Sequence, residues 1–187
     1  MKKWITILIS SCLLITLGWG CSFSLKNTEL PTYVANENCR QVSFKPGLEP
    51  EGFNGVKWET DISALQGMKR FEKNSRRGGI DFYKREGDGF QLKNGKSIPV
   101  QYGFWNEKFY VAMVTTESTS DWNALKEVVF SKYGEGAKPF KNKEEYLWTG
   151  KKAFMALRYD ETTNEGLYYI KNESMTKEID SSRTWKK

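Results

Sequence analysis

The stretch that decides the fold is IPVQYGFWNEKFYVAMVTTESTSDWNALKEVVFSKYG, residues 98–134. Apolar side chains recur at every second position in its first half, as in Val100, Tyr102 and Phe104, and they do so again after a short polar break. Alternate side chains of a strand point to opposite faces of a sheet, so the pattern predicts two strands. The polar break at residues 106–108 has the length of a hairpin loop.

A helix is predicted directly after this hairpin. Ser118 begins a run of N-cap residues, whose side-chain oxygens can accept hydrogen bonds from free backbone N–H groups. Gly134, a residue type common just past helix C-termini, marks the end of the helix. Between them, one apolar stripe at spacings of three and four is formed by Trp122, Leu125, Val129 and Tyr133. We expect this stripe to cover one face of the sheet.

The rest of the chain adds elements on both sides of this unit. Thr60 or Asp61 can cap a short helix. Alternating or aromatic runs predict further strands at residues 69–73, 80–84, 146–148, 153–157 and 166–171. The breaks are short, which favours hairpins over parallel crossovers. The expected fold is therefore α+β, with a mostly antiparallel sheet of about five to seven strands and with one long and one short helix packed on one face.

The N-terminus has the pattern of a bacterial secretory signal over residues 1–20. Two lysines precede the apolar run 4–17, which is shorter than the roughly 20 residues of a membrane-spanning helix. The run ends in Gly20 and Cys21, which resemble the cleavage box of bacterial lipoproteins. Acylation of Cys21 would anchor the protein stably, because each buried CH₂ group contributes about 0.8 kcal/mol. The alternative is ordinary cleavage and a soluble periplasmic protein, in which Cys21 and Cys39 can pair as a disulfide.

The mature chain divides into three parts. Residues 21–51 are polar and contain three prolines, so we expect a tether that holds the domain away from the membrane. Residues 52–171 contain the expected strands and helices and form the α+β domain. Residues 172–187 are polar and contain no glycine, and we expect them to be a flexible tail.

Composition excludes several classes of chemistry. The 187 residues include no histidine, which removes histidine-based triads, general bases and metal ligands. Three cysteines cannot build a thiolate zinc site, and no phosphate-binding fingerprint is present. We therefore expect no metal site and no cofactor. The net charge of +6 is scattered in short basic groups without stacking aromatics, which gives nucleic-acid binding no support.

Aromatic residues point to a candidate binding face. A sheet that is covered by helix on one side should be more polar on its other side. Strand alternation nevertheless places aromatic side chains on that second side, at Trp105, Phe154, Tyr168 and Tyr110. Tyrosine and tryptophan supply large contact area together with a polar group, so these residues predict a surface that binds a protein or peptide.

Two stretches carry a family resemblance. The spacing of Phe53, Gly55, Trp58 and Thr60, followed later by the run 132–135, resembles a family of bacterial periplasmic and lipoprotein domains that has no known activity. The resemblance covers about residues 53–171. The layout is also similar to the β-lactamase inhibitor protein and, more distantly, to outer-membrane assembly lipoproteins. Those proteins pack helices on one face of an antiparallel sheet and bind other proteins, so the resemblance implies this fold and no catalytic residues.

Three functional hypotheses follow. The leading one is a non-enzymatic, lipid-anchored domain of the bacterial cell envelope that recognises a protein or another envelope component. The second is a hydrolase that acts on an envelope polymer through carboxylates, for which the acids near strands and turns are Asp81, Glu86, Asp160 and Glu161. The third is a structural domain whose second sheet face is buried by its own tether or by a homodimer.

Overall fold

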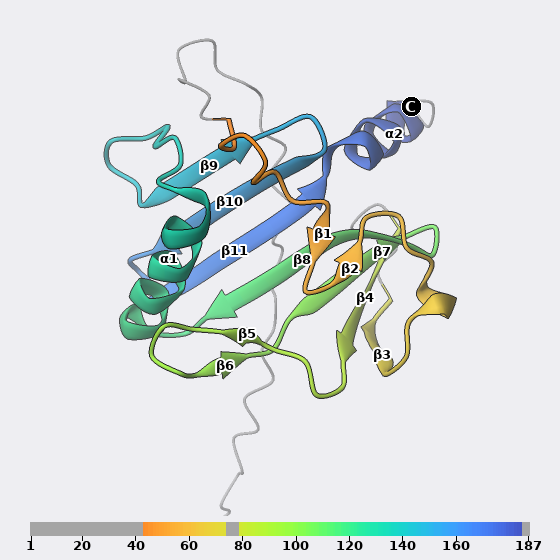
Figure 1. Ribbon diagram of the computed structural model, residues 1–187, viewed down its shortest axis with the longest axis horizontal. Helices are drawn as coiled ribbons and strands as arrows, with labels where there is room; N and C mark the ends of the chain where they lie inside the picture. Colours follow the sequence, from red (N-terminus) through yellow and green to blue (C-terminus); the bar gives the residue numbers. More distant parts are fainter. Residues whose placement is uncertain (1–42, 74–78, 185–187) are drawn as a thin grey trace, which may run out of the picture. The chain divides into compact units, whose positions relative to one another are not determined.

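The computed structural model describes residues 43–73 and 79–184, which belong to one compact unit of the chain, Tyr33–Lys187. The unit is an α+β domain, as predicted (Figure 1). Its elements in chain order are β1 (Gly52–Phe53), β2 (Val56–Lys57), the 3₁₀ turn η1 (Ile62–Ala64), β3 (Met68–Glu72), β4 (Ile80–Arg85), β5 (Phe90–Gln91), β6 (Ser97–Ile98), β7 (Gln101–Trp105), β8 (Lys108–Thr116), α1 (Thr119–Tyr133), β9 (Glu145–Thr149), β10 (Ala153–Asp160), β11 (Glu165–Asn172) and α2 (Glu173–Thr184).

Seven strands form the main sheet, in the order β3-β4-β7-β8-β11-β10-β9. Every neighbouring pair in this sheet is antiparallel, which confirms the predicted sheet type. The predicted hairpin is β7–β8, and it lies in the middle of the sheet. Asn106 and Glu107 form its tight turn with φ values of 47° and 64°, the left-handed backbone that a two-residue hairpin turn requires.

Helix α1 has the predicted ends and the predicted buried stripe. The backbone N–H of Asp121 donates to the Ser118 hydroxyl oxygen at 3.2 Å, and Gly134 follows the last turn with φ of 78°. The four stripe residues, Trp122, Leu125, Val129 and Tyr133, are all buried. They pack on strands β8 to β11, and the small hairpins β1–β2 and β5–β6 cover the remainder of the same sheet face (Figure 1).

The domain begins before the expected boundary at residue 52. Ser43 forms a parallel bridge with Thr149 at the edge of the sheet, and the Phe44 ring, 8% exposed, packs edge-on against Tyr133 at 6.0 Å. Residues 43–51 are thus part of the folded unit and not of the tether. Glu49 and Pro50 also hold this segment to the domain, through hydrogen bonds from the Ala153 N–H at 3.1 Å and from the Trp58 indole N–H at 3.0 Å. A short edge strand over residues 39–44 is a further sequence prediction, and of it the structure describes only Ser43, which forms the bridge, and Phe44.

The expected flexible tail is a second correction, because residues 173–184 form helix α2. The Asn172 side chain accepts a hydrogen bond from the Met175 N–H at 2.8 Å and so caps the helix. Met175 and Ile179, one turn apart, are each 3% exposed. Two apolar residues in a charged segment are enough to bury one side of a helix once a sheet is present to pack against.

The short helix expected after Thr60 is a single 3₁₀ turn, η1. Its N-cap is Asp61, whose carboxylate accepts the Ser63 hydroxyl at 2.7 Å and the Ser63 N–H at 2.9 Å, while the Lys108 ammonium lies at 3.0 Å. The Ser63 hydroxyl is the largest cause that holds the pKa of Asp61 at about 2, below its ordinary value; the Ser63 N–H and Lys108 lower it further.

This lowered pKa predicts an acid-dependent part of the stability. The folded state prefers the ionised Asp61, so its contribution is present above about pH 4 and is lost as pH falls toward 2. Denaturant unfolding should show that the difference in unfolding free energy between wild type and Asp61→Asn shrinks as the pH is lowered from 6 to 2. Asparagine keeps the capping oxygen but does not titrate. A difference independent of pH would contradict this account, and Glu117→Gln, at an exposed acid, serves as the control.

Candidate binding surface

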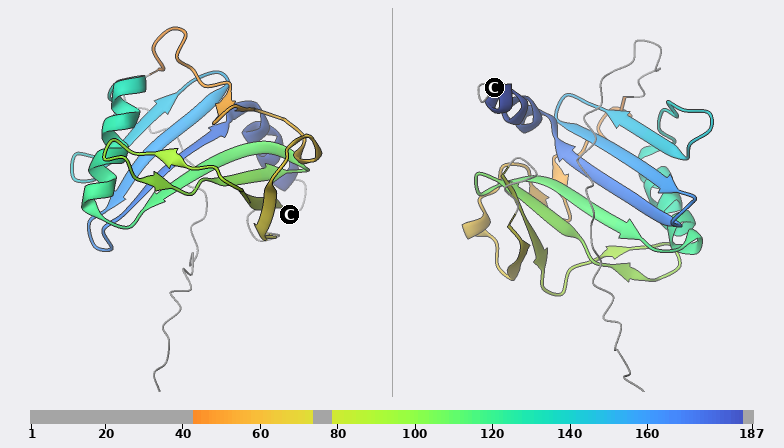
Figure 2. Two further views of the ribbon diagram at one scale, coloured as in Figure 1. Left: turned by 60° about the horizontal axis from the view of Figure 1, so that its bottom comes forward. Right: turned by 180° about the vertical axis from the view of Figure 1, so that it is seen from behind.

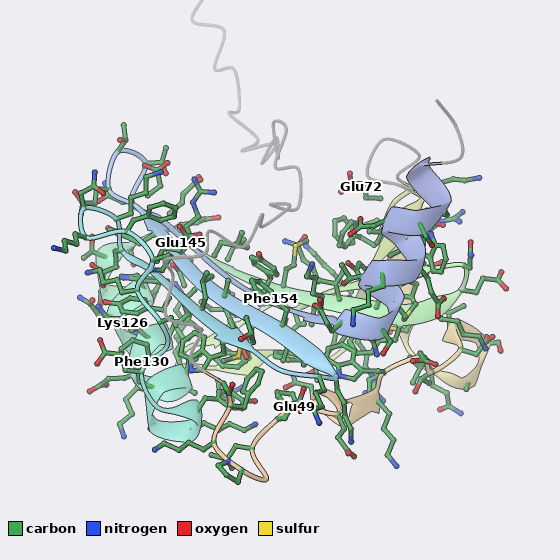
Figure 3. All side chains as sticks on the ribbon, turned by 90° about the horizontal axis from the view of Figure 1, so that it is seen from above. Glu49, Glu72, Lys126, Phe130, Glu145 and Phe154 are labelled. Carbon is green, nitrogen blue, oxygen red and sulfur yellow. The ribbon has the colours of Figure 1, made fainter. Side chains whose placement is uncertain are left out.

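Three of the four predicted aromatic residues share the sheet face opposite α1, which we call the second face. Trp105 pairs with Ile80 at the end of β7. The Tyr110 hydroxyl lies 3.1 Å from the hydroxyl of Thr176 in α2, so this helix packs on the second face. The Phe154 ring lies 5.9 Å from the Tyr169 ring. Figure 3 shows Phe154 and Glu145 on the other side of the strands from α1.

The sequence prediction placed the fourth residue, Tyr168, on the second face, and the structure shows that this is wrong. It pairs with Leu157 and Val114, is 1% exposed and packs in the core beneath α1. Its neighbour Tyr169 takes the place on the second face. Consecutive side chains of a strand point to opposite faces, so a shift of one residue exchanges the two faces. Because β11 carries tyrosines at consecutive positions, 168 and 169, alternation alone could not show which of them lies on the second face.

The aromatic residues of the second face are covered to different degrees. Tyr110 and Phe154 are buried, at 3% and 8% exposed, whereas Trp105 is half-buried. The Lys171 ammonium lies 5.2 Å from the centre of the Phe154 ring, a cation–π distance. The second face is therefore not the open aromatic surface that the sequence predicted.

The second face also holds a buried acid that the sequence did not single out. Glu145, on the edge strand β9, is 5% exposed and sits opposite Arg158 of β10 (Figure 3). Burial raises the pKa of Glu145, and the charge of Arg158 offsets part of that shift. Burial also raises the pKa of Tyr169, to which the charge of Glu145 adds. No sequence pattern indicates this acid, because strand-end glutamates are usually exposed.

A cavity of about 510 Å³ lies where the second face meets the β9–β10 turn and the start of α2. Phe154 lines it together with Phe44, so its apolar surface comes from segments far apart in the chain. The charged residues that line it are Lys45, Glu49, Lys151 and Glu173. Its size falls within the range of ligand pockets, roughly 300–1,000 Å³. It combines an apolar surface with charges at its margin.

Glu49 fixes one wall of this cavity. Its carboxylate accepts hydrogen bonds from the backbone N–H groups of Lys152 and Ala153, the latter at 3.1 Å, and so holds the β9–β10 turn (Figure 3). A Cβ on Gly150 would lie 2.1 Å from this carboxylate, so glycine leaves the space that Glu49 occupies. The two lysines at the margin, Lys45 and Lys151, are exposed. Glu49 and Glu173 line the same cavity, so its charged lining consists of two lysines and two glutamates.

Three of the four carboxylates considered for hydrolysis, Asp81, Glu86 and Asp160, have structural partners. Asp81 pairs with Arg70 at 3.3 Å, and Glu86 pairs with Lys69 at 3.3 Å. Asp160 accepts two backbone N–H groups of its own turn, from Thr162 and Thr163. Within residues 43–73 and 79–184, no group of three or more histidine, cysteine, aspartate or glutamate residues is arranged to hold a metal ion.

The predicted anchor residue lies outside the part of the chain that the structure describes. This is true of Cys21 and equally of Cys39, so their acylation or pairing stays a prediction. Across the described ranges, no helix combines the length and the apolar character that a membrane span needs.

Comparison with known proteins adds no relative. No protein-family model, no curated protein and no solved structure matches the chain significantly. The function therefore has to be argued from the residues themselves.

Proposed function

We propose that this chain is a non-enzymatic domain of the bacterial cell envelope, anchored through a lipid on Cys21, that binds a protein segment at the cavity beside Phe154. The cavity is the observation that supports this best. It is the place where one of the predicted binding residues lines an open space of ligand size. The resemblance of the chain to periplasmic and lipoprotein domains agrees with this proposal.

The lining of the cavity indicates what kind of segment fits. Phe44 and Phe154 offer apolar surface for one inserted side chain, the usual anchor of a protein interface. Lys45 and Lys151 stand at the margin, and both are exposed. An apolar side chain is the complementary ligand for the two rings, and a charged group beside it can pair with the lysines or with Glu173 at the margin, while burial supplies the affinity.

The test uses a photo-reactive amino acid at position 151, with the mature protein in its native membrane. We expect light to link position 151 to a distinct protein, and the Phe154→Ala variant, checked for folding by circular dichroism, to lose the product at least five-fold. The same amino acid at Asn123, exposed on α1, is the matched control. Identical products from both positions, or none from 151, would refute binding at the cavity.

The anchor is tested separately by intact mass spectrometry of the mature protein. We expect a chain that begins at Cys21 and carries the added mass of acyl groups. The Cys21→Ser variant should lose that mass and leave the membrane fraction. A mature N-terminus at another residue without lipid would overturn the anchor and leave the cavity proposal standing.

A further inference from the structure

The loop that joins α1 to β9 carries an exposed aromatic ring. Phe140 is 41% exposed, and the described residues include only two other large apolar side chains with comparable exposure, Leu48 and Phe71. Figure 1 and Figure 2 show that this loop projects past the edge strand β9, away from the rest of the sheet. The fold thus leaves an apolar ring in contact with water on a projecting loop.

Three lysines flank this ring. Lys138, Lys141 and Lys143 are all exposed, and residues 138–143, which we call the basic loop, contain no acid. The Lys143 ammonium lies 5.1 Å from the centre of the Phe140 ring. None of the three lysines forms an ion pair with a residue that the structure describes. The basic loop therefore combines an apolar ring with positive charge that is not compensated within it.

Both ends of the basic loop are fixed to the domain. On one side, Ala137 and Leu147 exchange two backbone hydrogen bonds, at 2.8 and 2.9 Å. On the other side, the Glu144 carboxylate pairs with the Lys126 ammonium, and the Glu144 carbonyl accepts the Tyr159 N–H at 2.9 Å. This ion pair also neutralises the acid that follows the loop. The ring and its lysines are thus presented from a fixed base.

The surroundings of Phe71 show what is particular to the basic loop. Phe71 is 44% exposed, and the Lys84 ammonium lies 5.1 Å from the centre of its ring, as Lys143 does from Phe140. Two cations beside it on β3, Lys69 and Arg70, are paired with acids at 3.3 Å. Phe71 therefore has the same exposed ring with partly neutralised charge, which makes it a matched control.

We propose that the basic loop docks on an anionic membrane surface, with the Phe140 ring at the boundary between headgroups and acyl chains and the lysines on the lipid phosphates. An apolar ring among cations is typical of segments that lie in the membrane interface. Lysine side chains lay their apolar stems along such a surface and keep the ammonium groups at the headgroups. Anionic lipids attract clustered basic residues, and salt weakens that attraction.

The proposed anchor favours a lipid surface over an acidic protein as the partner. A lipid on Cys21 would hold the domain beside a membrane and so raise the effective concentration of that surface at the loop. This step rests on the proposed function, whereas the exposure and the charge of the loop do not. Contact through one ring and three lysines is weak and reversible. The unlipidated protein therefore still leaves the membrane fraction, and the loop orients a domain that the lipid retains.

The test measures vesicle binding of the mature chain, residues 21–187, which carries Cys21→Ser so that it has no lipid of its own. We expect it to sediment at low salt with vesicles of equal parts phosphatidylglycerol and phosphatidylcholine. Binding to pure phosphatidylcholine should be at least ten-fold weaker. Binding to the anionic vesicles should be lost in about 1 M salt, where charges are screened beyond about 3 Å.

Two pairs of variants assign the binding to the basic loop. Phe140→Ser should bind the anionic vesicles at least three-fold more weakly, whereas Phe71→Ser should bind as wild type does. Replacement of the three loop lysines by glutamine should weaken binding at least ten-fold. Its control removes the same charge around Phe71, by glutamine at Lys69, Lys73 and Lys84, and should weaken binding less than two-fold. Circular dichroism checks that each variant folds, and if one does not, the other pair decides.

Several outcomes would refute docking on a membrane. They are no binding to the anionic vesicles, equal binding to neutral ones, or equal losses for the variants of the loop and their controls. Binding of soluble polyglutamate without binding of vesicles would assign the loop to an acidic protein segment and refute the proposal as well. Each of these results leaves the cavity and anchor proposals standing, because no residue of the basic loop lines the cavity.

Discussion

Replacing Trp122 by alanine is expected to lower the free energy of unfolding by about 3–5 kcal/mol. The indole is 1% exposed and stacks on the Tyr159 ring at 5.2 Å. A Cβ on Gly166 would lie 2.5 Å from the indole, so the ring packs directly on the backbone of β11. Truncation leaves a large cavity between α1 and the sheet, and most domains have only 5–15 kcal/mol of stability to lose.

Denaturant unfolding followed by circular dichroism measures this loss. The control is Asn123→Ala, one residue along the same helix turn, where the side chain is exposed and the expected change stays within about 0.5 kcal/mol. A Trp122→Ala variant as stable as the control would mean that α1 does not pack on the sheet through this residue.

Gly103→Ala is expected to destabilise the protein by about 1–3 kcal/mol, although it adds a single methyl group. That methyl carbon would lie 2.5 Å from Val111, 2.9 Å from Phe82 and 3.0 Å from Ile80. The three side chains are fully buried on the second face, so none can move into open space. Overpacking of a closed site forces side chains out of their rotamers or bends the strand.

A double-mutant cycle separates overpacking from a change in strand propensity. Val111→Ala removes the nearest contact, so the double variant Gly103→Ala, Val111→Ala should be more stable than the sum of the two single changes predicts, by at least about 1 kcal/mol. Simple additivity would show that the loss arises from the backbone, and it would contradict this description of the packing at Gly103.

The central hairpin and α1 were predictable because each carries a complete local signal. Alternation specifies β7 and β8, and Asn106 marks the turn between them. Ser118 and Gly134 bound the helix, and its stripe specifies the buried side. Such signals depend on backbone geometry within a few residues, so no tertiary contact is needed to interpret them.

The binding surface was only partly predictable. Phe154, Tyr110 and Trp105 share the second face, although a register shift of the β7–β8 pair puts the adjacent Tyr110 and Val111 on that face together, and Tyr168 belongs to the core. Where two consecutive strand residues are both aromatic, the sequence does not show which of them faces the core. The cavity beside Phe154 was beyond prediction, because Phe44, Glu49 and Glu173 reach it from segments separated by more than a hundred residues in the chain.

By itself, the sequence determined the class of fold, the central hairpin with its helix, and the chemistry that a chain without histidine cannot use. Those properties follow from local periodicity and from composition. The tertiary structure alone decided that residues 173–184 are a helix, that Phe44 belongs to the domain and that the second face is buried. Burial depends on which distant segments meet, and a segment with one or two apolar residues becomes ordered only when a sheet exists for it to pack on.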